Sequence, residues 1–208
     1  MAEQHPTTLT DRIRALTGGF MTVIGTKLFK LGVHPDAVTL LGLVIVLIAS
    51  FFIGSGELRI GGIILLLGLP LDAVDGAVAR AMNRTDRFGE MLDSSLDRYA
   101  DGLIFASLSY HFAVQDEFNL LVLALAALLG SFMVSYARAR GEGVGVIVKI
   151  GLLSRMERVA IILGMLLAPT VWGVPVLEIG LWVLAIGANF TALQRIWYVY
   201  KTLKDREG

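Results

Sequence analysis

Five of the six aspartates between residues 71 and 102 recur at helical spacing or lie close to such a pair: Asp72, Asp75, Asp93, Asp97 and Asp101. A helix turns about 100° per residue, so Asp72 and Asp75 would lie about 60° apart on one helix. On the same basis, Asp93 and Asp97 would lie about 40° apart on another. If these carboxylates converge in one pocket, they stay ionised only where cations neutralise them. The spacing therefore predicts a cation site.

Oxygen ligands without histidine or cysteine suit hard ions such as Mg²⁺, Mn²⁺ or Ca²⁺. Two such ions a few ångströms apart form a clamp suited to phosphoryl-type displacement. Gly76 follows Asp75 and lets a ligand approach the helix backbone. The alternative is that the acids pair with Arg80, Arg84, Arg87 and Arg98 in a solvated loop. We favour the metal site, because ionisable residues at membrane depth are functional by default.

A second group of residues is basic and could bind an anion. Arginine presents a planar fork of donors that suits bidentate phosphate binding. The alternative is attraction to anionic headgroups, which explains Lys201, Lys204 and Arg206 well. Four arginines adjoin apolar segments instead and are candidates for a phosphate pocket: Arg138, Arg140, Arg158 and Arg195.

The composition of the chain indicates the class of protein in which these acidic and basic residues lie. Of 208 residues, 55% are hydrophobic and 17% are charged, against about 25% charged in a soluble domain. The high hydrophobic content excludes a soluble cytosolic domain and a disordered chain. Because Lys+Arg and Asp+Glu both number 18, a nucleic-acid binder that relies on bulk charge is excluded as well. No cysteine is present, which excludes disulfides and thiolate ligands.

Apolar runs predict an all-α integral membrane protein with six transmembrane helices. A span needs roughly 20 apolar residues. Two of the runs, 60–71 and 102–114, reach that length only if their helices continue into the acidic segment between them. The predicted runs are 37–54, 60–71, 102–114, 118–137, 159–177 and 179–198.

Residues 11–32 precede these runs and have apolar residues at helical spacing with arginines and lysines among them. This pattern predicts an amphipathic helix in the membrane surface, or alternatively a soluble helix packed on the bundle. No linker or repeat divides the chain. We expect a single domain over 1–208, with the six-helix bundle at 37–200.

Lysine and arginine are distributed unevenly about the predicted spans. Only Arg59 falls in a loop on the second side. The other 17 of the 18 lie in the termini, in the loops on the first side or, for Arg195, near the first-side end of the last run. The positive-inside rule then predicts a multi-pass protein of the cell membrane with both termini, and the acidic site, facing the cytoplasm.

The acidic segment resembles the signature of the CDP-alcohol phosphatidyltransferases. Eight positions agree in residue type and in spacing: Asp72-x2-Asp75-Gly76-x2-Ala79-Arg80-x8-Gly89-x3-Asp93-x3-Asp97. The resemblance implies an amphipathic N-terminal helix, six spans and an enzyme that transfers a phosphatidyl group from a CDP-lipid to an acceptor hydroxyl, releasing CMP. It also implies two Mg²⁺ or Mn²⁺ ions bound by Asp72, Asp75, Asp93 and Asp97, with Asp97 as the general base.

The same resemblance implies donor contacts from Gly76 and Arg80. Asp86 stands where the family often has a small hydroxyl residue near the nucleotide, and its carboxylate could accept from a ribose hydroxyl. Asp36 and Thr39 resemble the family's Pro-Asp/Asn-x-x-Thr element, which touches the cytidine. For Asp36 an N-cap of the first span is the alternative, and both roles are compatible.

The basic motifs around Arg138–Arg140 and Arg155–Arg158 resemble the phosphatidylinositol-phosphate synthases within this family. That likeness implies CDP-diacylglycerol or a related CDP-lipid as donor and inositol 1-phosphate as acceptor. It also implies that six residues surround the acceptor's phosphate: Ser135, Arg138, Arg140, Arg155, Arg158 and Arg195. It also implies a homodimer. Two alternatives remain: a phosphatidylglycerol-phosphate synthase that uses glycerol 3-phosphate, and, from another class, a divalent-cation channel or carrier.

Overall fold

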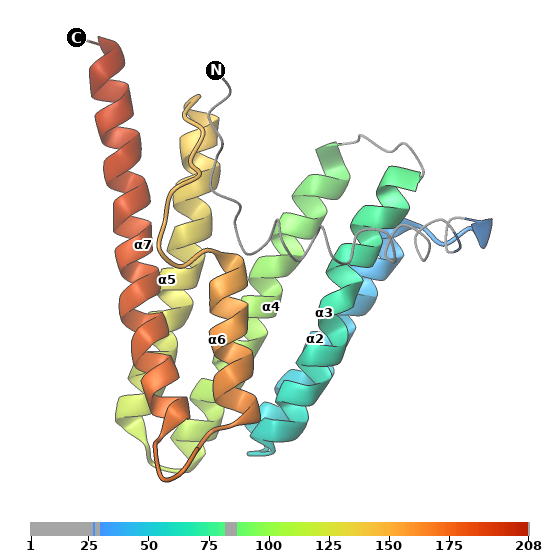
Figure 1. Cartoon of the computed structure of the whole chain (residues 1–208), viewed down its shortest axis with the longest axis vertical. Helices are drawn as coiled ribbons and strands as arrows, with labels where there is room; N and C mark the ends of the chain where they lie inside the picture. The colour runs from blue at the N-terminus through green and yellow to red at the C-terminus, as the bar shows by residue number, and fades with distance from the viewer. Residues whose placement is uncertain (1–26, 28–29, 82–86, 208) are drawn as a thin grey trace. The chain divides into compact units, whose positions relative to one another are not determined.

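The computed structural model describes Lys27 and residues 30–81 and 87–207, and this part of the chain is helical. The amphipathic helix predicted at 11–32 lies almost wholly outside the described residues. The helices are α2 Pro35–Gly54, α3 Leu58–Ala81, α4 Arg87–Val114, α5 Phe118–Gly143, α6 Arg155–Leu167 and α7 Val176–Glu207 (Figure 1). Within residues 30–81 and 87–207 no strand forms, apart from an isolated bridge between Val171 and Val174. The predicted all-α class is therefore confirmed.

Three helices of the described part are long and apolar enough to cross a membrane: Pro35–Gly54, Phe118–Gly143 and Val176–Arg206. The short runs at 60–71 and 102–114 do continue as helix into the acidic segment, as α3 and α4. The run at 159–177 is not one helix, and that prediction is wrong. α6 ends at Leu167, and Trp172 and Gly173 then take positive φ angles of 49° and 82° in a turn.

The described residues fall into two compact units. One contains the described residues of 1–44 together with 67–97. There the beginning of α2 packs on the end of α3, because Val38 meets Val74 and Val78 in a buried cluster. Val33 and Leu71 cover this cluster. The contact holds the acid-bearing end of α3 in a defined register against α2.

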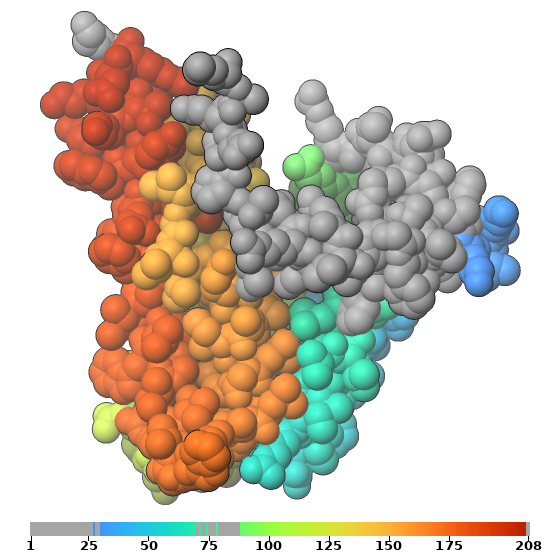
Figure 2. All heavy atoms as spheres, viewed as in Figure 1, coloured from blue at the N-terminus to red at the C-terminus, as the bar shows by residue number. Residues whose placement is uncertain are grey.

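The other unit contains 45–66 and the described residues of 98–208. Within it α5 and α7 lie side by side, and α6 packs against α7 (Figures 1 and 2). Val134 of α5 is buried against Ala188 and Ala192 of α7. A Cβ on Gly130 would lie 2.8 Å from the backbone nitrogen of Asn189, so only glycine allows this approach. Small residues at helix contacts are typical of membrane proteins.

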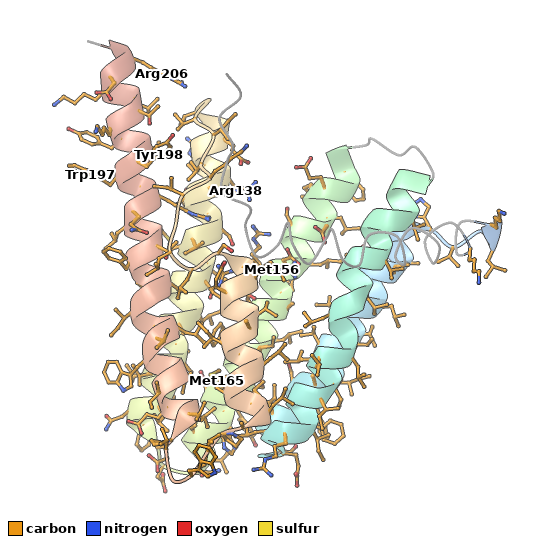
Figure 3. All side chains as sticks on the ribbon, viewed as in Figure 1. Arg138, Met156, Met165, Trp197, Tyr198 and Arg206 are labelled. Carbon is orange, nitrogen blue, oxygen red and sulfur yellow. The ribbon has the colours of Figure 1, made fainter. Side chains whose placement is uncertain are left out.

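Polar and apolar side chains of this unit are placed as a lipid environment requires. The Asn189 amide donates to the carbonyl of Ala126 at 2.8 Å across the α5–α7 contact. Trp197, by contrast, points away from α5 on the outer side of α7 (Figure 3) and is 66% exposed. Apolar side chains thus cover the outside of the helices, whereas polar groups find partners between them.

Candidate active site

α3 carries the first two signature aspartates one helical turn apart, at positions 72 and 75. The backbone there is helical, and the neighbouring Val74 and Val78 are buried against α2. The side chains of Asp72, Asp75, Gly76 and Arg80 lie outside what the structure describes, as does the whole of Asp86. Their predicted roles therefore stay predictions.

α4 carries the other two signature aspartates, and their side chains are described. Asp93 is exposed and Asp97 is half-buried, four residues apart in one unbroken helix. Both make interactions within the protein. Among the residues whose side chains are described, no group of three or more acids and histidines is close enough to hold a metal ion. The donor set nevertheless fits a hard divalent ion in its chemistry, because carboxylate oxygens are the ligands such ions prefer.

The Pro-Asp element lies at the beginning of α2. The helix starts at Pro35, so Asp36 belongs to its first turn and does not occupy the N-cap position. Proline is common as the first residue of a helix, because its missing N–H would have no partner there. The Asp36 carboxylate lies 3.3 Å from Nδ1 of His34, and the Thr39 hydroxyl donates to the Pro35 carbonyl at 3.2 Å. Both polar groups thus lie at one helix end.

Arg195 of α7 is the centre of the basic group. It is only 7% exposed. Its Nε donates to the carbonyl of Ile150 at 2.9 Å, and its Nη1 donates to the carbonyl of Val134 at 2.8 Å. The side chain therefore joins α7 both to α5 and to the loop between α5 and α6.

Arg158 of α6 is more deeply buried, at 3% exposed. Its Nη2 lies 3.3 Å from Oδ2 of Asp101, and its Nη1 donates to the carbonyl of Leu153 at 3.4 Å. Its Nε has no hydrogen-bond partner among the described residues. A buried guanidinium with an unused donor is suited to receive an oxyanion.

The structure brings three of the predicted pocket residues together. Arg195 and Arg158 donate to carbonyls of one loop, those of Ile150 and Leu153, and Arg138 follows by one helical turn the Val134 whose carbonyl Arg195 also contacts. Arg138, labelled in Figure 3, is itself exposed. It donates to Glu142 at 2.9 Å. No contact with this group is described for Ser135, which is half-buried in α5, or for Arg140, which is exposed. Arg155 begins α6 and makes an interaction within the protein.

Two further residues fix the loop between α5 and α6, and sequence reasoning did not find them. The backbone N–H of Leu153 donates to the Thr191 hydroxyl at 3.0 Å. Gly151 has a φ of 139°, and a Cβ there would lie 2.6 Å from Cγ2 of Thr191. Thr191 precedes Arg195 by one helical turn, which was the available signal.

Comparison with known proteins decides what this arrangement belongs to. The family model described as CDP-alcohol phosphatidyltransferase matches residues 32–193. The chain belongs to this family. It is therefore an enzyme of the phosphatidyltransferase class, as the aspartate signature predicted.

Proteins of known name are similar in sequence to this chain along most of their length. A phosphatidylinositol phosphate synthase of Streptomyces avermitilis is 37% identical over 192 residues, covering 88% of this chain and 79% of the relative. An archaetidylinositol phosphate synthase of Pyrococcus horikoshii is 37% identical over 183 residues, covering 87% and 91%.

Solved structures agree with the fold. The phosphatidylinositol phosphate synthase of Mycobacterium tuberculosis with CDP-DAG bound has a TM-score of 0.81 at 31% identity, over 86% of this chain and 93% of that one. The same Mycobacterium tuberculosis enzyme in complex with manganese and citrate has a TM-score of 0.80, over 86% and 88%.

Proposed function

We propose that the protein transfers a phosphatidyl group from CDP-diacylglycerol to inositol 1-phosphate, giving phosphatidylinositol phosphate and CMP. Family membership supports the reaction class. The observation that carries the acceptor is the group formed by Arg138, Arg158 and Arg195, in which two of the three arginines are buried. A buried, net positive group of arginines favours an acceptor that carries a phosphate.

The donor assignment rests on a relative that was solved with CDP-DAG bound. By their match to the family signature, Gly76 and Arg80 contact the CDP moiety in this proposal. Asp86, which stands where the family often has a small hydroxyl residue, accepts a hydrogen bond from a ribose hydroxyl. Asp36 and Thr39 add contacts to the cytidine from the beginning of α2. The two apolar tails of such a donor are compatible with an enzyme whose helices expose apolar side chains.

Asp72, Asp75, Asp93 and Asp97 would hold the metal, two ions of Mg²⁺ or Mn²⁺. A relative solved with manganese supports a divalent ion. When bound, such ions offset negative charge on the diphosphate and on the departing CMP. Four carboxylates from the ends of two helices supply the hard oxygen donors that this role requires.

Asp97 acts as the general base in this proposal. Its carboxylate takes the proton of an acceptor hydroxyl, whose oxygen then bonds to the phosphorus that carries the diacylglycerol. The bond between that phosphorus and the oxygen of CMP breaks, and CMP leaves with the electron pair. A positioned carboxylate raises the rate of such a step by about 10²–10⁴-fold.

The membrane setting completes the proposal. The excess of lysine and arginine on one side favours a cytoplasmic site, with both termini on that side. The enzyme acts as a homodimer. The family match favours a transferase over a channel or carrier. Glycerol 3-phosphate is the competing acceptor, because it also presents a phosphate to the arginines.

One assay tests the acceptor directly. Purified protein is supplied with CDP-diacylglycerol and Mn²⁺ or Mg²⁺, and CMP release is measured with inositol 1-phosphate or with glycerol 3-phosphate. We expect release with inositol 1-phosphate only, and none when the metal is chelated. Release with glycerol 3-phosphate alone would establish the competing acceptor, whereas equal release without any acceptor would refute the phosphate pocket.

A further inference from the structure

Arg158 raises a question that the acceptor pocket alone does not answer, namely what keeps its charge in a buried position. The side chain is 3% exposed. Removing a guanidinium from water costs several kcal/mol unless a partner of opposite charge compensates it. Its carbonyl contact, to Leu153, is long at 3.4 Å, and its Nε has no described partner.

Asp101 is the carboxylate that meets this charge. Its side chain is 13% exposed, and its Oδ2 lies 3.3 Å from Nη2 of Arg158. It comes from α4, whereas Arg158 begins the buried face of α6. Asp101 is not one of the four signature aspartates, so nothing in the proposed metal site requires it. Its described ion pair links two helices that are 57 residues apart in the chain at this point.

Two further arginines, Arg138 and Arg195, belong to the same group as this ion pair. Arg138 and Arg158 act on Arg195, and Glu142 acts against them. Asp101 pairs with Arg158 and Glu142 pairs with Arg138, whereas Arg195 has no carboxylate partner among the described residues. Asp101 engages Nη2, and the buried Nε of Arg158 has no hydrogen-bond partner among the described residues. A charged donor without a partner at a buried position is suited to bind an anion such as phosphate.

We propose that Asp101 is a positioning residue of the acceptor pocket. It holds Arg158 at its buried place and in the orientation that leaves Nε free for the acceptor's phosphate. The inference rests on the proposed function in taking the three arginines as the site of that phosphate. The competing view is that the ion pair only joins α4 to α6 and has no part in binding.

Two variants separate these views. Asp101→Asn keeps the shape of the side chain but removes the counter-charge. The double variant Asp101→Leu with Arg158→Met replaces the pair by apolar side chains of similar volume, which commonly preserves or raises stability. Asp116→Asn is the control, because Asp116 is an exposed aspartate just after α4.

The first measurement is the thermal unfolding midpoint of each purified protein during titration with inorganic phosphate in the absence of divalent ions. The second is KM for acceptor and for CDP-diacylglycerol. For Asp101→Asn we expect the apparent Kd for phosphate and the acceptor KM to rise at least about tenfold, as for loss of a charge-assisted hydrogen bond. The donor KM should change less than about twofold, and Asp116→Asn should match the wild type.

The double variant decides whether the pair as a whole takes part in binding, even where Asp101→Asn does not fold. We expect it to fold with a normal unfolding midpoint but to show no stabilisation by phosphate. Phosphate binding and an acceptor KM like those of the wild type would overturn the inference, since the pair would then be only a strut. A wild-type protein that phosphate does not stabilise would overturn it too. If phosphate stabilises the wild type but inositol 1-phosphate yields no CMP, the proposed acceptor fails, and the variants' phosphate titrations still decide the role of Asp101.

Discussion

The acid-bearing helix ends and the arginine group place their side chains by different means. Asp72 with Asp75, and Asp93 with Asp97, are spaced three and four residues apart, so one helix suffices to bring each pair onto one face. Arg195 instead reaches carbonyls 45 and 61 residues away in the chain. The carboxylate pairs are products of local structure, whereas the arginine group exists only once α5, α6 and α7 have packed.

This difference predicts how the two regions respond to mutation. A carboxylate that is not needed for packing affects the chemistry when it is replaced, and stability changes little. A buried arginine with backbone partners contributes to binding and to stability together, because its loss leaves carbonyls without donors. Three substitutions, taken in order of decreasing effect, examine this contrast.

Asp97→Asn should have the largest effect. The amide cannot take a proton from the acceptor, so we expect CMP release to fall by about 10²–10⁴-fold. The unfolding midpoint and the affinity for CDP-diacylglycerol should change little, since a neutral side chain of the same shape remains. Glu90→Gln is the control, because Glu90 is an exposed carboxylate in the first turn of the same helix. Normal turnover in Asp97→Asn would refute the assignment of the base.

Arg195→Gln should have an intermediate effect, and on two quantities at once. Loss of the charge should raise the acceptor KM by about 10–100-fold and the donor KM far less. Loss of the bonds to Ile150 and Val134 should lower the free energy of unfolding by about 1–3 kcal/mol.

Arg206→Gln is the matched control, because Arg206 is an exposed arginine of the same helix that also donates to a carbonyl, that of Gly145 at 3.2 Å. It should alter neither quantity by much. An equal rise of both KM values in Arg195→Gln would place Arg195 outside the acceptor pocket. Unchanged stability would remove the contrast between the two regions.

Local spacing is what the sequence reveals well. Hydropathy and helical spacing predict the all-α class and the continuation of α3 and α4 through the charged segment, and the signature predicts the family. The run at 159–177 was misjudged for a physical reason. Hydropathy does not register the turn at Trp172 and Gly173, nor the Pro175 that precedes α7.

Pairings between distant residues could not be predicted. The alternative for the acids considered only the arginines of their own segment, but the described partner of Asp101 is Arg158, on another helix. Likewise, the sequence marks Arg195 as a candidate for binding phosphate, yet not as a donor to Ile150 and Val134. Such contacts depend on how the helices pack, which no spacing within one helix encodes.

Thr191→Val should have the smallest effect, and it tests whether the loop or the arginine charge governs the acceptor. Valine keeps the shape of threonine but leaves the buried N–H of Leu153 without its acceptor, which costs about 1–3 kcal/mol of stability. The bonds of Arg195 to Ile150 and Val134 are untouched, so the acceptor KM should rise less than about threefold. Stability is measured by thermal unfolding, and the acceptor KM is measured by CMP release.

Thr202→Val is the control for the long-range part of this effect. Each threonine donates to the carbonyl four residues earlier in α7, Thr191 to Gly187 and Thr202 to Tyr198, but only Thr191 also accepts from the loop. The difference in stability between the two variants combines the Leu153 bond with the deeper burial of Thr191, which is 0% exposed whereas Thr202 is half-buried. If both lose the same stability, that bond contributes nothing. If Thr191→Val raises the acceptor KM as much as Arg195→Gln does, the position of the loop between α5 and α6 sets acceptor binding. Acceptor affinity would then depend more on how the loop is held than on the charge of Arg195.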